Sequence, residues 1–95
     1  MQKIEAVLQS IGVLVRSVRS TTMDQHELAA RSGVGRNTVS NIENGKSVSV
    51  QSLFLVLEQL ELIDDLQLFV DEKNSQSELK LKRKSRKYKE LDNDF

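Results

Sequence analysis

Residues 25–44, with the sequence QHELAARSGVGRNTVSNIEN, carry polar side chains that can hydrogen-bond to the edges of DNA bases. Arginine offers two parallel donors that match O6 and N7 of guanine, and asparagine offers a donor and an acceptor that match N7 and N6 of adenine. The N-terminal turns of the second helix expected here would enter the major groove. We assign the base-reading role to Arg36, Asn37, Ser40 and Asn41.

Contacts to the DNA backbone supply affinity and fix the register of a protein on the duplex without carrying sequence information. Gln25 stands where the first helix of the segment is expected to begin, and free N–H groups at a helix start can receive a phosphate. Asn44 and Lys46 follow the second helix and could hold the backbone on the other side. We assign phosphate binding to Gln25, Thr38, Asn44 and Lys46.

Glu43 requires a different interpretation, because an acidic side chain in the last turn of a DNA-reading helix would repel phosphate if it pointed outward. We expect it to point inward and to pair with Arg19 or Arg16 of the preceding segment. Removal of one partner of a buried ion pair is costly, so the pair would anchor the reading helix.

Two helices joined by a tight turn are needed to position these side chains. Leu28, Val34, Val39 and Ile42 provide apolar anchors at helical spacing, and Ala29 is small where crossing helices would approach closely. Gly33 falls where the chain must reverse, and glycine enters the left-handed region without steric cost. The pattern predicts a helix-turn-helix.

Helical patterns also precede and follow this segment. A first helix is predicted by the apolar residues Ile4, Val7, Leu8, Ile11, Leu14, Val15 and Val18. Asp24 and Glu27 form a capping box for the second helix, and Ser49 can cap a fourth. Inward-facing residues of that fourth helix would be Val50, Leu53, Phe54, Val56, Leu57 and Leu60.

A short fifth helix is predicted over residues 64–70, with Leu66 and Phe69 turned inward. The sequence DEKNSQSE at 71–78 has no apolar residue and indicates a linker. We therefore predict an all-α domain at 1–70 followed by a polar linker and a basic C-terminal tail at 71–95.

Composition limits the possible functions. The chain of 95 residues has no cysteine and one histidine, which supply neither a thiolate metal site nor the usual nucleophilic triads. We expect no enzymatic activity, no metal and no cofactor. No run of about eighteen apolar residues is present, and the N-terminus lacks the layout of a signal peptide, so a cytoplasmic protein is expected.

The net charge of zero conceals a segregation of charge along the chain. Residues 80–89, KLKRKSRKYK, contain basic residues and no acidic ones, whereas the last six residues contain three acidic side chains. Such a basic run can hold nucleic-acid phosphates or an acidic protein face, or it can be a solvated, disordered end.

Over residues 4–70 the chain resembles the Cro/C1-type, or Xre-type, helix-turn-helix regulators of bacteria and their phages. The residues that carry the resemblance are Gln25, Leu28, Ala29, Gly33, Val34, Thr38, Val39 and the Ile42-Glu43-Asn44-Gly45 run. It implies a five-helix lambda-repressor-like domain that binds double-stranded DNA as a transcriptional repressor. In that family a homodimer reads an inverted-repeat operator, and here Leu55, Leu62 and Leu68 could face the partner subunit.

The sequence departs from the family pattern at two positions of the motif. Ser32 occupies a site that is usually apolar, and Gly35 stands where serine or threonine usually caps the reading helix. The leucine-rich segment after residue 50 and the basic end are similar to HipB-type antitoxins, which bind a HipA-type kinase toxin. A prophage or mobile-element repressor and a non-catalytic adaptor that binds protein or RNA are the alternatives.

Overall fold

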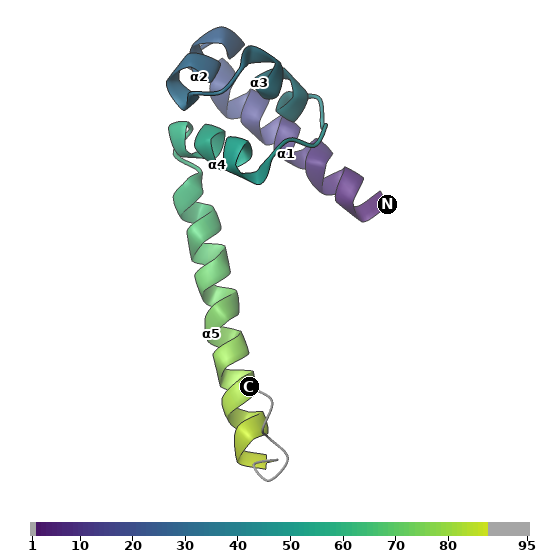
Figure 1. Ribbon diagram of the computed structural model, residues 1–95, viewed down its shortest axis with the longest axis vertical. Helices are drawn as coiled ribbons and strands as arrows, with labels where there is room; N and C mark the ends of the chain where they lie inside the picture. Colours follow the sequence, from purple (N-terminus) through teal and green to yellow (C-terminus); the bar gives the residue numbers. More distant parts are fainter. Residues whose placement is uncertain (1, 88–95) are drawn as a thin grey trace. The chain divides into compact units, whose positions relative to one another are not determined.

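The computed structural model describes the backbone of residues 2–87 and the side chains of residues 2–82. Five helices make up this part of the chain, which contains no strand, and the predicted all-α fold is confirmed (Figure 1). The helices are α1 (Gln2–Ser20), α2 (Gln25–Ser32), α3 (Arg36–Glu43), α4 (Val50–Gln59) and α5 (Ile63–Lys87). The chain divides into two compact units, Met1–Asp64 and Asp65–Phe95, which are described separately.

The predicted helix starts are formed by local side-chain caps. Asp24 Oδ1 accepts a hydrogen bond from the Glu27 N–H at 2.8 Å, and Ser49 Oγ accepts one from the Ser52 N–H at 3.1 Å. The reciprocal half of the predicted capping box is replaced, because the Glu27 carboxylate instead accepts a hydrogen bond from Arg31 one turn later. The first turns of α2 and α4 are therefore fixed by sequence-local contacts.

The turn between α2 and α3 depends on Gly33. This residue has φ +74°, the left-handed conformation predicted from the sequence. Its N–H donates to the Ala29 carbonyl at 3.0 Å, and the Val34 N–H donates to the same carbonyl at 3.1 Å. These bonds satisfy a carbonyl that the end of α2 would otherwise leave unpaired. Gly35 caps α3 in an extended conformation without a side-chain hydrogen bond, as predicted.

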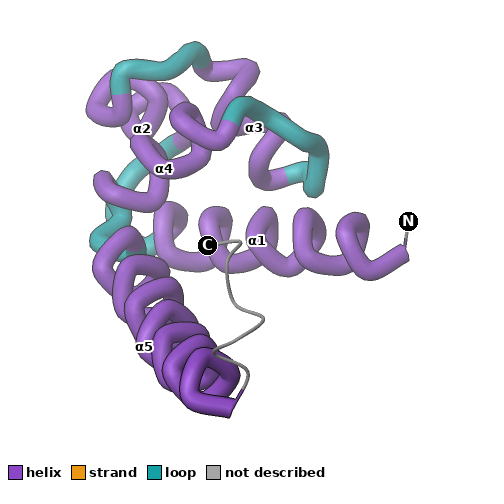
Figure 2. Tube along the Cα trace, turned by 60° about the horizontal axis from the view of Figure 1, so that its bottom comes forward, coloured by secondary structure: helices purple, strands orange, loops and turns teal. Residues whose placement is uncertain are grey.

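In the first unit, α3 packs against α1, α2 and α4, and α2 packs against α4 (Figure 2). The buried apolar residues are Val15, Leu28, Ala29, Val39, Ile42, Val56, Leu57 and Leu60. Most of the predicted anchors are among them, and Val34 is half-buried. Ser32 is also buried and its Oγ has no hydrogen-bond partner among the described residues, which costs stability at a site where the family usually has an apolar side chain.

Gly12 allows a close approach between α1 and α3. A Cβ atom at this position would lie 2.6 Å from the Ile42 carbonyl oxygen and 2.8 Å from the Glu43 carbonyl oxygen. Both distances are shorter than any tolerable carbon–oxygen contact, so only glycine fits where the end of α3 crosses α1. The apolar periodicity of α1 gave no sign of this contact.

Several residues predicted to face inward are exposed instead. They are Ile4, Val7, Leu14, Val50 and Phe54, and between 41% and 65% of each side chain is exposed. We call these five residues, which belong to α1 and α4, the apolar surface. The first turns of α1 extend past α3 and α4, which explains why part of a continuous apolar stripe has no neighbour in this unit (Figure 1). Leu55 and Leu62, predicted to face a partner, are half-buried, and Leu68 is exposed.

The predicted end of the fifth helix at residue 70 and the linker at 71–78 are wrong, because α5 continues to Lys87. The absence of apolar residues at 71–78 indicates absence of burial, but this stretch lacks proline and glycine and can remain helical. Gln67 Nε2 supports the continuation by donating to Asp71 Oδ1 at 3.1 Å. Phe69, predicted to turn inward, is exposed with Lys73 Nζ 5.8 Å from its ring centroid. Residues 88–95 of the predicted tail lie outside the described residues.

Candidate nucleic-acid interface

The outward side of α3 is a polar stripe. We use this name for Asn37, Ser40, Asn41 and Asn44, which follow the i, i+3, i+4, i+7 spacing of one helix face. Asn37 and Asn44 are exposed, and the two central residues are half-buried. Asn44 Nδ2 lies 3.4 Å from Ser40 Oγ as a hydrogen-bond donor. This hydrogen bond joins Ser40, which is predicted to read bases, to Asn44, which is predicted to bind phosphate.

Arg36 and Asn37 are exposed in the first turn of α3, which is the part of a recognition helix that contacts base edges. Neither side chain makes a hydrogen bond or an ion pair to another described residue, so both are available to a ligand. Thr38 is half-buried, and its N–H donates to the Gly35 carbonyl at 3.0 Å. The two longest polar side chains of the helix thus lie at the end where direct readout is expected.

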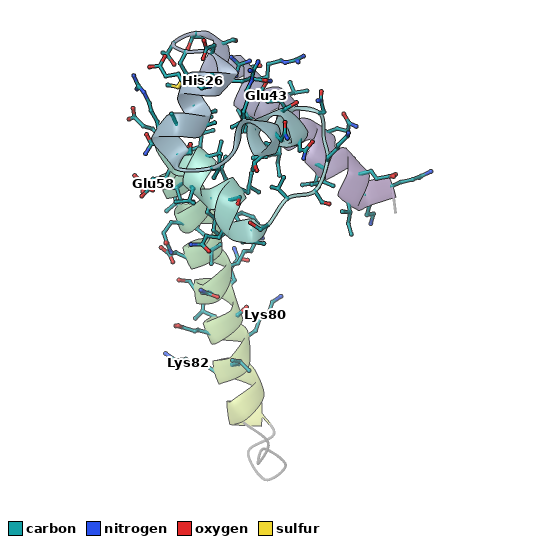
Figure 3. All side chains as sticks on the ribbon, turned by 45° about the horizontal axis from the view of Figure 1, so that its top comes forward. His26, Glu43, Glu58, Lys80 and Lys82 are labelled. Carbon is teal, nitrogen blue, oxygen red and sulfur yellow. The ribbon has the colours of Figure 1, made fainter. Side chains whose placement is uncertain are left out.

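Glu43 lies at the other end of α3 and its side chain is fully buried (Figure 3). Arg19 Nε and Nη2 donate to its two carboxylate oxygens, the Nη2–Oε1 distance being 3.1 Å. Gln25 Nε2 donates to Oε1 at 3.0 Å, and Arg16 Nε lies 3.5 Å from the same oxygen. Arg19 Nη1 also donates to the Met23 carbonyl at 2.9 Å. The predicted pairing of Glu43 with α1 is confirmed, and it joins α1, α2 and α3.

Both members of this pair are charged. Burial raises the pKa of Glu43, but the hydrogen bonds from Arg19 and Gln25 and the charges of Arg19 and Arg16 outweigh it, so the pKa of Glu43 lies below its ordinary value. The hydrogen bond to Glu43 is also the main cause that raises the pKa of Arg19. A bidentate contact between arginine and carboxylate fixes orientation as well as charge, so α3 is held in one position.

Gln25, predicted to bind phosphate, uses one amide N–H for Glu43. A carboxamide carries two N–H donors, so the second can still reach a phosphate from an orientation set by the buried carboxylate. The Asp24 carboxylate occupies the N–H of Glu27 and brings negative charge to the start of α2. The helix start is therefore a poor phosphate site by itself, and the Gln25 side chain becomes the main group there.

The loop after α3 carries Asn44 and Lys46, both exposed. Gly45 has φ +75°, and the Lys46 N–H donates to the Asn41 carbonyl at 2.9 Å. A Cβ atom at Gly45 would lie 2.8 Å from Cδ of Gln9, so this α1 side chain packs directly on the loop. Sequence reasoning missed Gln9. Its position seven residues before Arg16 puts both on one face of α1 and was the available signal.

Among the residues that the structure describes, no group of three or more histidine, aspartate or glutamate side chains could hold a metal ion. No helix in the same part of the chain is long and apolar enough to cross a membrane.

A comparison with protein-family models agrees with this geometry. A helix-turn-helix family model matches residues 22–64, which span α2, the turn, α3 and α4. Comparisons with curated proteins and with solved structures found no match. The fold and the exposed polar face of α3 define a helix-turn-helix protein that binds double-stranded DNA and regulates transcription. The matched segment is the helix-turn-helix of the Cro/C1-type, or Xre-type, regulators that the sequence resembles.

Proposed function

We propose that the protein is a sequence-specific repressor that binds an inverted repeat in its own promoter as a homodimer, without catalysing a reaction. The observation that carries this proposal is the exposed polar stripe, with Arg36 beside it, on a helix fixed by the buried Glu43. Selective binding requires side chains held close to their productive geometry. A dimer on a promoter would then exclude the transcription machinery by occupying its site.

The roles of the individual residues follow from their positions. Arg36 reads a guanine and Asn37 an adenine, because their side chains offer matching pairs of hydrogen-bonding groups. Ser40 and Asn41 contact a base or a thymine methyl group one turn further along α3. Phosphate contacts come from Gln25, Thr38, Asn44 and Lys46.

Arg36→Ala tests base reading against phosphate binding. We expect it to weaken binding to the selected operator by about 1 to 3 kcal/mol and to relax specificity at one base pair. Lys46→Ala is the matched control, because loss of a phosphate contact weakens binding to all sequences about equally and lowers the salt slope by about one. Titration of operator and random duplexes with both variants distinguishes the two effects. Equal weakening of both duplexes by Arg36→Ala would assign this residue to phosphate.

The apolar surface supports the dimer. One helix-turn-helix contacts about half a turn of DNA, and a twofold pair presents two recognition helices to successive grooves. A hollow of about 170 Å³ between α1 and α4 is lined in part by Leu8, Ile11, Val50 and Leu53, so Val50 of the apolar surface borders a hollow that α1 also lines. Val7 is two residues from Gln9, which packs beside the recognition helix, and therefore lies on the opposite side of α1. A second copy bound there leaves the polar stripe free.

Val7→Glu should dissociate the dimer, because it places a charge in an interface that buries apolar side chains. Sedimentation of the wild-type protein should give a mass near twice 10.8 kDa, and the variant should sediment as a monomer at micromolar concentration. Val13→Glu is the control, since Val13 is 64% exposed but lies on another face of α1. A monomeric wild-type protein, or equal behaviour of the two variants, would refute this interface.

The resemblance to HipB-type antitoxins predicts a HipA-like kinase as a protein partner. If it is right, a HipA-like kinase encoded beside this gene co-purifies with the protein, whereas integrase or phage genes in that position favour a prophage repressor. Footprinting on DNA upstream of the protein's own reading frame tests autoregulation. A protected inverted repeat supports the proposal, and its absence counts against control of that promoter.

A further inference from the structure

We infer that the basic end of α5, residues 80–87, is a second DNA-binding element that holds phosphates without reading sequence. This segment has no acidic residue, and its basic residues are Lys80, Lys82, Arg83, Lys84, Arg86 and Lys87. The sequence alone left open whether this charge lies in a disordered end. In the structure, α5 continues through the segment and gives it a defined helical register.

The register places four of these residues on one side of α5. Lys80, Arg83, Lys84 and Lys87 follow the i, i+3, i+4, i+7 spacing, and we call these four the basic stripe. They extend along about 10 Å of helix at a rise of about 1.5 Å per residue. Lys82 is two residues from Lys80, and the two side chains point to opposite sides of α5 in Figure 3.

The side chains of residues 80–82 are described, and their positive charges are not neutralised by ion pairs with other described side chains. Lys80 and Lys82 are exposed, and the ion pairs of the described side chains involve other residues. Like charges three and four residues apart on a helix repel each other and destabilise it. A ligand with closely spaced negative charges removes this repulsion, and a nucleic-acid backbone has this chemistry.

The composition favours DNA over a membrane or a protein. A helix that lies on a membrane needs a broad apolar face, and Leu81 is the one apolar residue in the segment. Protein interfaces depend on buried aromatic or aliphatic anchors. Phosphate contacts need only positive charge, and the helix-turn-helix on the same chain brings the segment to DNA at a high effective concentration. The inference thus rests on DNA binding by the first unit and adds sequence-independent affinity to it.

A charge-neutral variant of the full chain, K80Q/R83Q/K84Q/K87Q, tests the inference. The matched control is the charge-conserving variant K80R/R83K/K84R/K87R. Binding to a 30-base-pair duplex of random sequence is measured between 50 and 200 mM salt. Loss of four phosphate contacts should lower the slope of log K against log salt by about 3.6, so that wild-type affinity falls about a hundredfold more than that of the variant over this range. The control should keep the wild-type slope.

An unchanged slope in the glutamine variant, with helicity retained by circular dichroism, would overturn the inference. Preferential binding of wild-type protein to poly-glutamate over duplex DNA would also overturn it and would assign the basic stripe to an acidic protein. A loss of operator recognition can be distinguished from these outcomes, because it lowers the ratio of the affinity for the operator to the affinity for the random duplex. The glutamine variant leaves that ratio unchanged, whereas Arg36→Ala lowers it.

Discussion

Arg19→Met is expected to destabilise the helix-turn-helix domain by about 3 kcal/mol or more, because it leaves a buried carboxylate without its main partner. The Glu43 side chain is fully buried, and Arg19 supplies hydrogen bonds to both of its oxygens. Methionine keeps the length of the aliphatic part of the arginine side chain, so the change removes the guanidinium group with less loss of packing than truncation to alanine. Urea unfolding followed by circular dichroism measures the effect, and operator affinity should fall because α3 loses its attachment to α1.

The double variant Arg19→Met/Glu43→Leu is the control for this experiment. An apolar pair in place of a buried ion pair is often neutral or stabilising, so the second change should restore much of the lost stability. A double variant as unstable as Arg19→Met would show that the arginine acts through packing and not through its charge.

The pH dependence of stability provides a second readout of the same pair. Because the pKa of Glu43 is lower in the folded state, the stabilisation is present above the unfolded pKa of about 4.3 and is lost as pH falls through the folded value. The wild-type protein should therefore lose stability between about pH 5 and pH 3 more steeply than the double variant. Identical slopes would mean that this carboxylate is not held in its charged form.

Gly12→Ala is expected to destabilise the domain by about 1 to 3 kcal/mol, opposite to the usual effect of this substitution. In an exposed helix, alanine is about 1 kcal/mol more favourable than glycine. Here the added Cβ meets the carbonyl oxygens of Ile42 and Glu43 at 2.6 and 2.8 Å, and these backbone atoms cannot rotate away. Relief of the clash requires α3 to move away from α1, so operator affinity should fall together with stability.

Ser17→Ala is the matched control, since Ser17 is exposed on the same helix. It should leave unfolding and DNA binding nearly unchanged, which surface substitutions usually do. If Gly12→Ala proved as stable as this control, the close crossing of α1 and α3 would be wrong.

The parts of the fold that were predictable from the sequence depend on local signals. Gly33 marked a left-handed turn and Asp24 marked a helix start, because each conformation is fixed by its own residue and near neighbours. The inward position of Glu43 was predictable for a different reason, since an acidic side chain is unfavourable beside phosphate. These predictions required no knowledge of how the helices pack.

The features that the sequence did not indicate depend on packing between distant segments. Gly12 has no local pattern that identifies a carbonyl 30 residues away in the chain as its neighbour. The apolar spacing of α1 grouped Val7 and Leu14 with Val15 on one face but could not show that only Val15 is covered. The length of α5 was not predictable from composition, because a polar stretch without apolar residues can be either a linker or an exposed helix.

Selection of bound duplexes from a random library tests most directly whether α3 reads sequence in a twofold complex. The wild-type protein should enrich an inverted repeat whose half-sites lie about one helical turn of DNA, about 10 base pairs, or a multiple of it apart. The Arg36→Ala variant should lose preference at one symmetrical position of that repeat. Recovery of unrelated sequences by the wild-type protein, with no common half-site, would contradict the assignment of α3 as a base-reading helix.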